Sequence, residues 1–209
     1  PLAIELAAAR VRVMPPRTLL HRMSERFRLL TSSGGRHTRQ VTLRATLDWS
    51  WEMLTPDEQQ ALAQLSVFEG GFTLEAAEAV LSLPEAWPAD AVQALVDKSL
   101  VRPAGGGRFD LLVSVQEYAS LRLVELGAEE ATQARHGRHF AQHGTVEAID
   151  ALTRHGGVER LRGLVADRDN LVAACRRALA RMDVSVAVPA LLAAWKALES
   201  RGPFDMACE

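Results

Sequence analysis

The stretch from Thr42 to Val80, TLRATLDWSWEMLTPDEQQALAQLSVFEGGFTLEAAEAV, decides the fold. Its apolar residues recur at helical spacing, and strong start and stop signals separate the helical runs. Thr55-Pro56-Asp57-Glu58 is a capping box with proline at the first helical position. Gly70-Gly71 can end that helix, and Thr73 can cap the next one. The stretch therefore predicts three amphipathic helices.

The residues that follow predict a further helix and a hairpin. A helix is expected from Pro88 to Ser99. Two short β-prone runs, Leu100–Arg102 and Arg108–Leu112, flank the turn sequence Pro103–Gly107, which is typical of a β-hairpin. Ser114–Glu117 has the form of a second capping box, and Gly127 can end the helix that it opens.

The order of these elements, with helices followed by a two-stranded β wing and a last helix, predicts a winged-helix domain over residues 41–127. Residues 1–40 and 128–209 are also predicted to be helical. In the second of these ranges the expected helices are 129–143, 145–153, 158–182 and 184–200. The fold class is therefore mainly α, with a small two-stranded β wing.

Composition excludes several classes of protein. The 209 residues are 48% hydrophobic, but no apolar run reaches the ~18 residues that a membrane helix needs. Two cysteines are too few for a disulfide framework. No signal peptide is recognisable, and the absence of an initial Met suggests an internal fragment. We therefore expect a cytoplasmic protein without a membrane partner.

Charge is distributed unevenly along the chain. Residues 10–44 hold nine arginines and one glutamate, a net charge of +8. Residues 45–100 hold ten acidic residues and one lysine, a net charge of −9. The basic segment either forms ordinary solvated helix faces or docks on something acidic, such as the −9 region, a nucleotide or another domain.

No catalytic constellation is recognisable. A G-x-x-x-x-G-K-[ST] phosphate loop is absent, so we expect that this chain is not an enzyme and does not hydrolyse ATP. His136, His139 and His143 share one helical face, which His155 could approach. Three imidazoles could hold zinc, but we interpret this face as polar or partly buried and expect no metal.

Several motifs together resemble the STAND (NB-ARC-like) class of signal-transduction ATPases, in the branch found in bacterial LuxR-type regulators. Pro1–Ala7 is similar to the end of that family's G-L-P-L-A motif. The winged-helix hallmarks and a motif that heads the helical repeats are similar to the following segments: Thr42–Ser50, Leu65–Phe68 with Gly70–Phe72, Leu95–Leu100 and Asp169–Leu171.

The resemblance implies three parts. Residues 1–40 would end the helical lid of a nucleotide-binding module, 41–127 would be the winged helix, and 128–209 would begin a TPR-like superhelix. It implies ATP or ADP as cofactor of a missing N-terminal nucleotide domain and no cofactor in this fragment. Pro1 is the residue that it places near the nucleotide. The interface candidates are Arg22, Arg26, Arg44, Asp48 and Trp49.

One motif departs from the family pattern. A Met-His-Asp motif contacts the nucleotide in related plant resistance proteins, and the matching positions here are Leu111, Leu112 and Val113. None of these side chains can hydrogen-bond a phosphate. This departure argues against ADP sensing through the motif.

The helix 88–99 occupies the position of a DNA-recognition helix. It offers Asp90, Gln93, Asp97 and Lys98, a net charge of −1 within the −9 region. Because DNA readers need cations that neutralise phosphates, this charge argues against direct DNA binding.

The sequence is thus interpreted as a non-catalytic regulatory fragment of a STAND-type signalling protein or transcriptional regulator. Its winged helix would pack on the nucleotide domain as an autoinhibitory clamp, and its helices would form a protein-interaction platform for an unknown protein or small-molecule signal. One alternative is a winged-helix transcription factor that binds DNA directly. A second is a helical adaptor that binds a protein or peptide.

Overall fold

The structure is a computed structural model that describes residues 40–199. The chain divides into two compact units, Pro1–Met53 and Leu54–Glu209, and each is considered by itself. In the first unit, α4 spans Gln40–Glu52. The predicted lid helices lie outside the described residues, and the predicted boundaries at 40/41 and 127/128 stay predictions.

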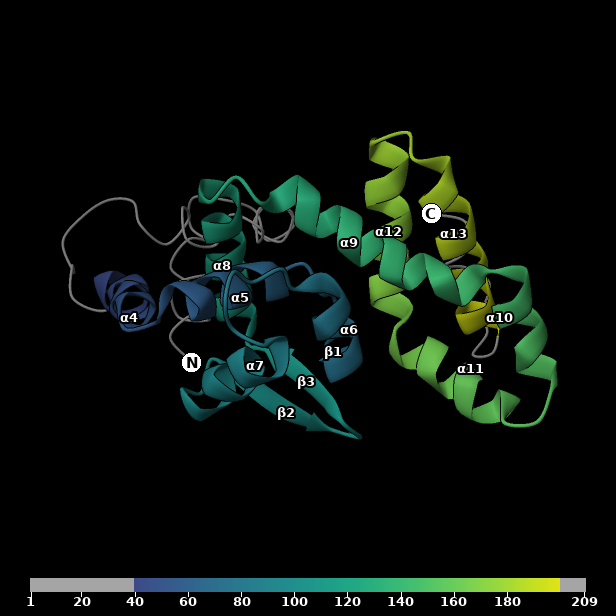
Figure 1. Cartoon of the computed structure of the whole chain (residues 1–209), viewed down its shortest axis with the longest axis horizontal. Helices are drawn as coiled ribbons and strands as arrows, with labels where there is room; N and C mark the ends of the chain where they lie inside the picture. Colours follow the sequence, from purple (N-terminus) through teal and green to yellow (C-terminus); the bar gives the residue numbers. More distant parts are fainter. Residues whose placement is uncertain (1–39, 200–209) are drawn as a thin grey trace, which may run out of the picture. The chain divides into compact units, whose positions relative to one another are not determined.

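The second unit begins with a winged helix (Figure 1). Its elements, in chain order, are α5 (Pro56–Leu65), β1 (Phe72–Thr73), α6 (Leu74–Val80), α7 (Pro88–Asp97), β2 (Val101–Gly105), β3 (Arg108–Leu111) and α8 (Val113–Glu125). This order confirms the mainly α fold class with a winged helix. It also adds one element to the prediction, the two-residue strand β1.

The first predicted capping box forms and the second does not. The Thr55 amide donates to Glu58 Oε2 at 2.8 Å, and the Glu58 amide donates to Thr55 Oγ1 at 3.3 Å. The prediction that Ser114 caps α8 is wrong, because Leu112 occupies the N-cap without any side-chain cap. Strand β3 ends at Leu111, so the chain enters the helix before Ser114 can act as a cap.

The sheet has three antiparallel strands in the order β1-β3-β2. Phe72 of β1 pairs with Phe109 of β3, next to the turn at Gly71. Gly71 has φ +87°, and a Cβ there would lie 2.7 Å from the Phe109 carbonyl oxygen. The turn therefore requires glycine for both its backbone angle and its space. Over this sheet, α5, α6, α7 and α8 enclose the core.

The winged-helix core consists of apolar side chains from the helices and strands. Its fully buried members include Leu62, Leu65, Phe68, Phe72, Val80, Val92, Leu95 and Val101. Phe68 stacks on Phe72 with ring centroids 4.8 Å apart, and Phe72 stacks on Phe109 at 5.8 Å. Burial of each such side chain contributes about 1.5–3 kcal/mol, so this cluster is a major source of the domain's stability.

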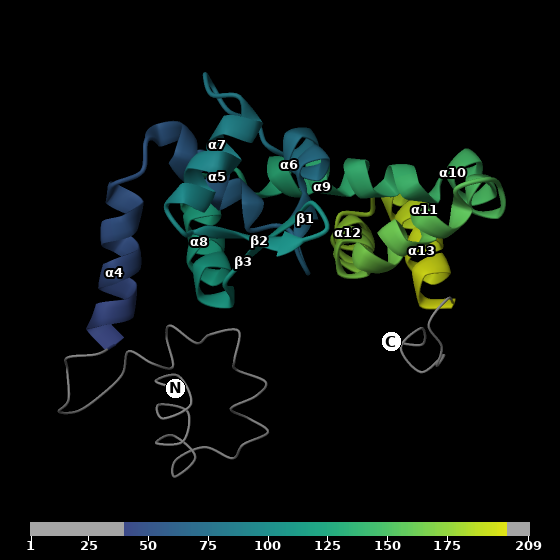
Figure 2. The same cartoon turned by 90° about the horizontal axis from the view of Figure 1, so that it is seen from below.

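The rest of the second unit is helical. It comprises α9 (Glu129–Ala141), η2 (Gln142–Gly144), α10 (Val146–Asp150), η3 (Ala151–Thr153), α11 (Gly157–Ala166), α12 (Arg168–Ala180) and α13 (Val184–Glu199). Figures 1 and 2 show α9 running from the winged helix to the α12–α13 pair. The single helix predicted over 158–182 is two helices, because the backbone breaks at Asp167.

Alanines allow α12 and α13 to pack closely. Ala174, Ala178, Ala190, Ala193 and Ala194 are buried between or beside these helices. A Cβ at Gly144 would lie 1.7 Å from the Pro189 carbonyl oxygen, so this glycine allows the 3-10 turn η2 to contact α13. None of the helices in residues 40–199 is long and apolar enough to cross a membrane.

Candidate functional site

Helix α7 presents a polar face to solvent. Its inner face buries Ala91, Val92 and Leu95 in the winged-helix core. Asp90, Gln93 and Asp97 are exposed on the other side. Gln93 Nε2 donates to Asp97 Oδ1 at 2.8 Å, which orients the Gln93 carboxamide. The exposed face of α7 therefore carries hydrogen-bonding groups on a rigidly packed helix.

Lys98 lies at the end of this helix, and Arg102 lies in the wing that follows it. Lys98 caps the end of α7 and forms an ion pair with Glu58. Arg102 of β2 pairs with Asp110 of β3 at 2.7 Å and is 57% exposed. Burial raises the pKa of Glu58, but hydrogen bonds from Lys98 and the Thr55 amide outweigh it and leave the pKa below its usual value. Each cation thus has a carboxylate partner within the domain.

Arg108 is the third cation of this region and behaves differently. It begins β3, directly after the turn Gly105–Gly107. Its Nη2 contacts Asp167 Oδ1 at 2.7 Å, the Gly71 carbonyl at 3.2 Å and the Ala166 carbonyl at 3.4 Å. This wing arginine therefore bonds to the helical region at the α11–α12 break.

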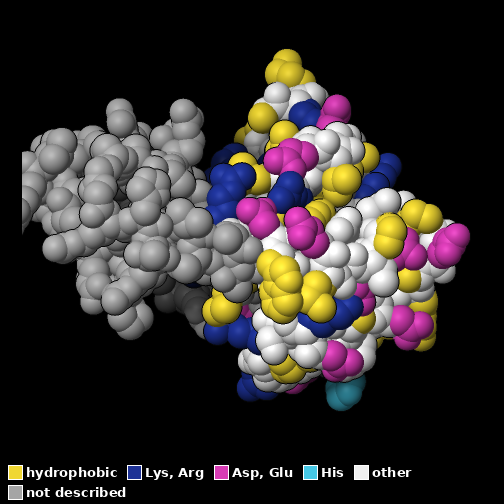
Figure 3. Space-filling view, turned by 90° about the vertical axis from the view of Figure 1, so that its left-hand side faces the viewer, with side chains coloured by type: hydrophobic (Ala, Val, Ile, Leu, Met, Phe, Trp, Pro, Cys, Tyr) yellow, Lys and Arg dark blue, Asp and Glu magenta, His cyan; other side chains and the backbone are white. Residues whose placement is uncertain are grey.

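On the molecular face drawn in Figure 3, basic and acidic side chains of the described residues are interspersed.

A polar junction joins the turn after α5 to α12. Asn170 is fully buried, and its Oδ1 accepts from the Glu69 amide at 2.7 Å. Its Nδ2 donates to the Gly71 carbonyl at 2.8 Å. Arg177 Nη1 donates to the Val67 carbonyl at 2.7 Å. These bonds satisfy the backbone of a partly buried, irregular turn, so they fix the winged helix on the helical region.

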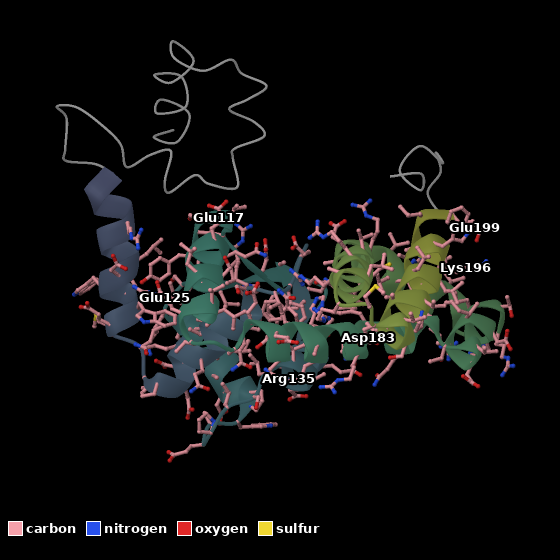
Figure 4. All side chains as sticks on the ribbon, turned by 90° about the horizontal axis from the view of Figure 1, so that it is seen from above. Glu117, Glu125, Arg135, Asp183, Lys196 and Glu199 are labelled. Atoms are coloured by element: carbon pink, nitrogen blue, oxygen red, sulfur yellow. The ribbon has the colours of Figure 1, made fainter. Side chains whose placement is uncertain are left out.

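Arg135, labelled in Figure 4, adds a second connection from α9. Its Nε donates to the Val80 carbonyl at 2.6 Å, and its Nη2 donates to Gln64 Oε1 at 2.8 Å. Burial lowers its pKa from the usual value, with a smaller effect from Arg138. Gln64 in turn bonds the Ser82 backbone through both ends of its carboxamide.

His136 packs at the centre of the same junction. Its ring lies 4.7 Å from Phe140 and 5.3 Å from Phe68, measured between centroids, and its Nε2 lies 3.3 Å from Asn170 Oδ1. Its Nδ1 is buried without a hydrogen-bond partner. Burial, and next the charge of Arg177, lower the pKa of His136 to about 3 although Asn170 opposes the shift. His136 is therefore neutral at pH 7.

The predicted histidine face is partly buried. His139 is half-buried, and burial, followed by the charge of His143, lowers its pKa from the usual value. In residues 40–199 no three His, Cys, Asp or Glu side chains gather as a metal-binding group. Cys175 is a buried free thiol. The expectation that this face binds no metal stays a prediction, which elemental analysis of the purified protein can test.

Only some of the resemblance-based site residues fall within the part of the chain that the structure describes. Pro1, Arg22 and Arg26 lie outside the described residues. In α4, Arg44 Nε lies 3.9 Å from Asp48 Oδ2, and Trp49 is 62% exposed. The interface roles of these residues stay predictions.

The positions compared with the Met-His-Asp motif lie where β3 passes into α8. Leu111 is buried at the end of β3, whereas Leu112 and Val113 are 47% and 51% exposed. This is the expected location after the wing, and all three side chains are apolar. Their inability to sense ADP stays a prediction.

Sequence reasoning missed the residues that hold the junction. The sequence marks Asn170 only within the Asp169–Leu171 motif and Arg108 only as a wing residue, and it gives no sign of the contacts of Arg135 and Arg177. Their partners are 55 to 110 residues away along the chain, so no local spacing reveals them. The one available signal is a polar Asn170 between apolar helix positions.

Comparison with known proteins finds a domain model and relatives that match parts of the chain. Residues 54–124 match the winged helix-turn-helix domain. A Mycobacterium tuberculosis protein named "Putative HTH-type transcriptional regulator" is 42% identical over 147 residues, which are 67% of this chain and 17% of that protein. An uncharacterized protein of the same organism is 39% identical over 150 residues, 68% of this chain and 38% of that protein. No solved structure matches the chain significantly.

These findings correct the expectation that the chain does not bind DNA, because both the domain match and the regulator's name point to DNA binding. The net charge of −9 counts only residues 45–100 and leaves out cations that other parts of the chain supply. Arg177, for example, pairs with Glu69. The matched relatives are longer proteins, of which the chain spans 17% to 38%. Residues 54–124 of this chain fold as a winged helix and match the model of the winged helix-turn-helix domain.

Proposed function

We propose that the chain is the winged-helix and helical segment of a bacterial transcriptional regulator, and that its winged helix-turn-helix domain binds duplex DNA. The observation that carries the proposal is the polar outer face of α7 in a complete winged-helix arrangement, with the wing beside it. A relative's name as a transcriptional regulator supports it.

The α7 face supplies groups that can read bases in a major groove. Gln93 has the carboxamide that pairs bidentately with adenine. Asp90 and Asp97 can accept from the amino group of cytosine. A site rich in adenine and cytosine on the contacted strand is therefore the preferred DNA in this proposal.

Contacts to DNA phosphates would come from cations that form ion pairs with carboxylates in this structure. Lys98 is 40% exposed and Arg102 is 57% exposed, so both can exchange partners without unfolding the domain. The exposed Arg102–Asp110 pair contributes only about 0–1 kcal/mol, so the exchange of Arg102 is energetically small. Lys98 pairs with the largely buried Glu58, so its exchange costs more. Affinity is expected to be modest and to fall steeply with salt.

The test is fluorescence anisotropy of a labelled random-sequence duplex, titrated with the 209-residue chain at several salt concentrations. Binding that weakens with salt is expected. Lys98→Gln should lower affinity and reduce the salt slope by about 0.9, because one phosphate contact is lost. Lys196→Gln is the matched control, since Lys196 pairs with Glu199 on α13, and it should leave the slope unchanged. Absence of binding at low salt would refute the proposal.

A second candidate is the regulatory segment of a STAND-type ATPase, in which the winged helix clamps a nucleotide domain. The rigid junction at Asn170 and Arg177 favours it, because a clamp must transmit force between the winged helix and the helices. In this candidate the isolated chain is not an ATPase and binds nucleotide weakly. Micromolar ATP binding by calorimetry would contradict it.

A further inference from the structure

Arg108 is a wing cation that the helical region holds. The turn before it consists of three glycines with φ of +82°, +60° and +73°. The strands of the hairpin carry two cations, Arg102 in β2 and Arg108 in β3. Arg102 is exposed and bonds within the hairpin. The side chain of Arg108 is only 17% exposed and bonds outside it.

The site that holds Arg108 is well suited to a guanidinium. Asp167 lies between α11 and α12, is 15% exposed, and accepts from Arg108 Nη2 at 2.7 Å. The Ala166 carbonyl belongs to the last residue of α11, where the helix dipole is negative. A carboxylate and a helix C-terminus thus attract the same cation.

We propose that this contact is autoinhibitory, and that the helical region lowers the DNA affinity of the winged helix by keeping Arg108 from phosphate. The inference rests on the proposed DNA-binding function and concerns its regulation. A DNA phosphate and Asp167 compete for the guanidinium of Arg108. DNA binding that uses both wing arginines, Arg102 and Arg108, therefore requires Arg108 to leave the α11–α12 break.

The competition couples the two regions in both directions. Any change that separates α11 and α12 at Asp167 frees Arg108 and strengthens DNA binding. Equally, DNA that takes Arg108 weakens the attachment of the wing to the α11–α12 break. The junction bonds of Asn170 and Arg177 do not use Arg108, so the winged helix stays attached while the wing arginine is exchanged.

Asp167→Asn tests this directly, because it removes the charge and keeps the size of the side chain. In the duplex anisotropy assay it should raise affinity about 3- to 10-fold and steepen the salt slope by about 0.9, as one phosphate contact is gained. Glu159→Gln is the matched control. It removes the same charge from an exposed ion pair on α11, away from the wing, and should change affinity less than twofold.

Arg108→Gln provides an independent test if Asp167→Asn folds poorly. In the otherwise unchanged chain it should leave DNA affinity unaltered, because Arg108 is already bound to Asp167. In the Asp167→Asn background it should abolish the gain. A purely structural ion pair predicts lower stability without any gain in affinity.

Two negative results have different meanings. If the unchanged chain binds DNA but Asp167→Asn matches Glu159→Gln in affinity and slope, the autoinhibitory contact is overturned and the proposed function stands. Loss of affinity in Arg108→Gln alone would overturn it as well. If no variant binds duplex DNA at low salt, the proposed function fails and this inference fails with it.

Discussion

At the scale of single residues, Asn170 connects two regions of the second unit. It donates to the Gly71 carbonyl and accepts from the Glu69 amide, and it is fully buried. Asn170→Ala leaves the Glu69 amide without a partner, removes one of the two hydrogen bonds to the Gly71 carbonyl and opens a small cavity. Because each unsatisfied buried group costs about 1–3 kcal/mol, we expect a loss of about 2–4 kcal/mol in the free energy of unfolding, measured by urea denaturation.

Arg176→Ala is the control for Asn170→Ala. Arg176 is exposed on the same helix, α12, and its replacement should change the free energy of unfolding by less than about 0.5 kcal/mol. Equal effects of the two substitutions would contradict the role assigned to Asn170.

His136 makes stability depend on pH. Its pKa is about 3 in the folded chain, below the usual value of 6.5, because it is buried. A depressed histidine pKa means that the unfolded chain binds the proton more readily. Stability is therefore fully present above pH 6.5 and is lost as pH falls toward 3, by at most about 1.4 kcal/mol per pH unit from this residue.

Urea denaturation between pH 7 and pH 4.5 measures this effect. In His136→Leu the loss of stability over that range should be smaller than in the unchanged chain. His155→Gln, at an exposed position, should behave as the unchanged chain does. A His136→Leu variant with the full pH dependence would show that other groups cause it.

At the scale of elements, the turn between α5 and β1 depends on Gly71. Gly71→Ala places a Cβ 2.7 Å from the Phe109 carbonyl oxygen and keeps an unfavourable φ of +87°. Gly105→Ala has a similar φ of +82° but open space around it. The left-handed backbone costs about 1–2 kcal/mol in both. We expect Gly71→Ala to be less stable by a further 1–3 kcal/mol or so, since the sheet must shift.

Thermal or urea denaturation of the two alanine variants separates these effects. Because backbone strain is shared, their difference reports the close approach of β1 to β3. Equal destabilisation would mean that the sheet accommodates the extra methyl group freely.

The helices of the winged helix were predictable because their signals are local. Thr55, Glu58, Pro88 and Gly127 act where the sequence places them. The Ser114 cap failed because strand pairing, a nonlocal interaction, decides where α8 begins. Strand β1 escaped prediction for the same reason, since two residues carry no periodic pattern.

At the scale of the whole molecule, the distribution of charge was harder to predict than the fold. Summed charges say nothing about which carboxylate faces which cation. The pairs Lys98–Glu58, Arg102–Asp110 and Arg108–Asp167 join residues 8 to 59 positions apart, and they decide which charges remain for a ligand. The candidate DNA face was therefore located by the element order, whereas its electrostatic character required the structure.

The most direct test of DNA recognition is an NMR titration of the isotopically labelled chain with duplex DNA at low salt. Signals of α7 and of the β2–β3 hairpin are expected to shift, because these elements form the proposed contact surface. Signals of α10 and the outer face of α13 should remain in place. Shifts confined to the helical region, or no shifts at a saturating DNA concentration, would contradict DNA recognition by the winged helix.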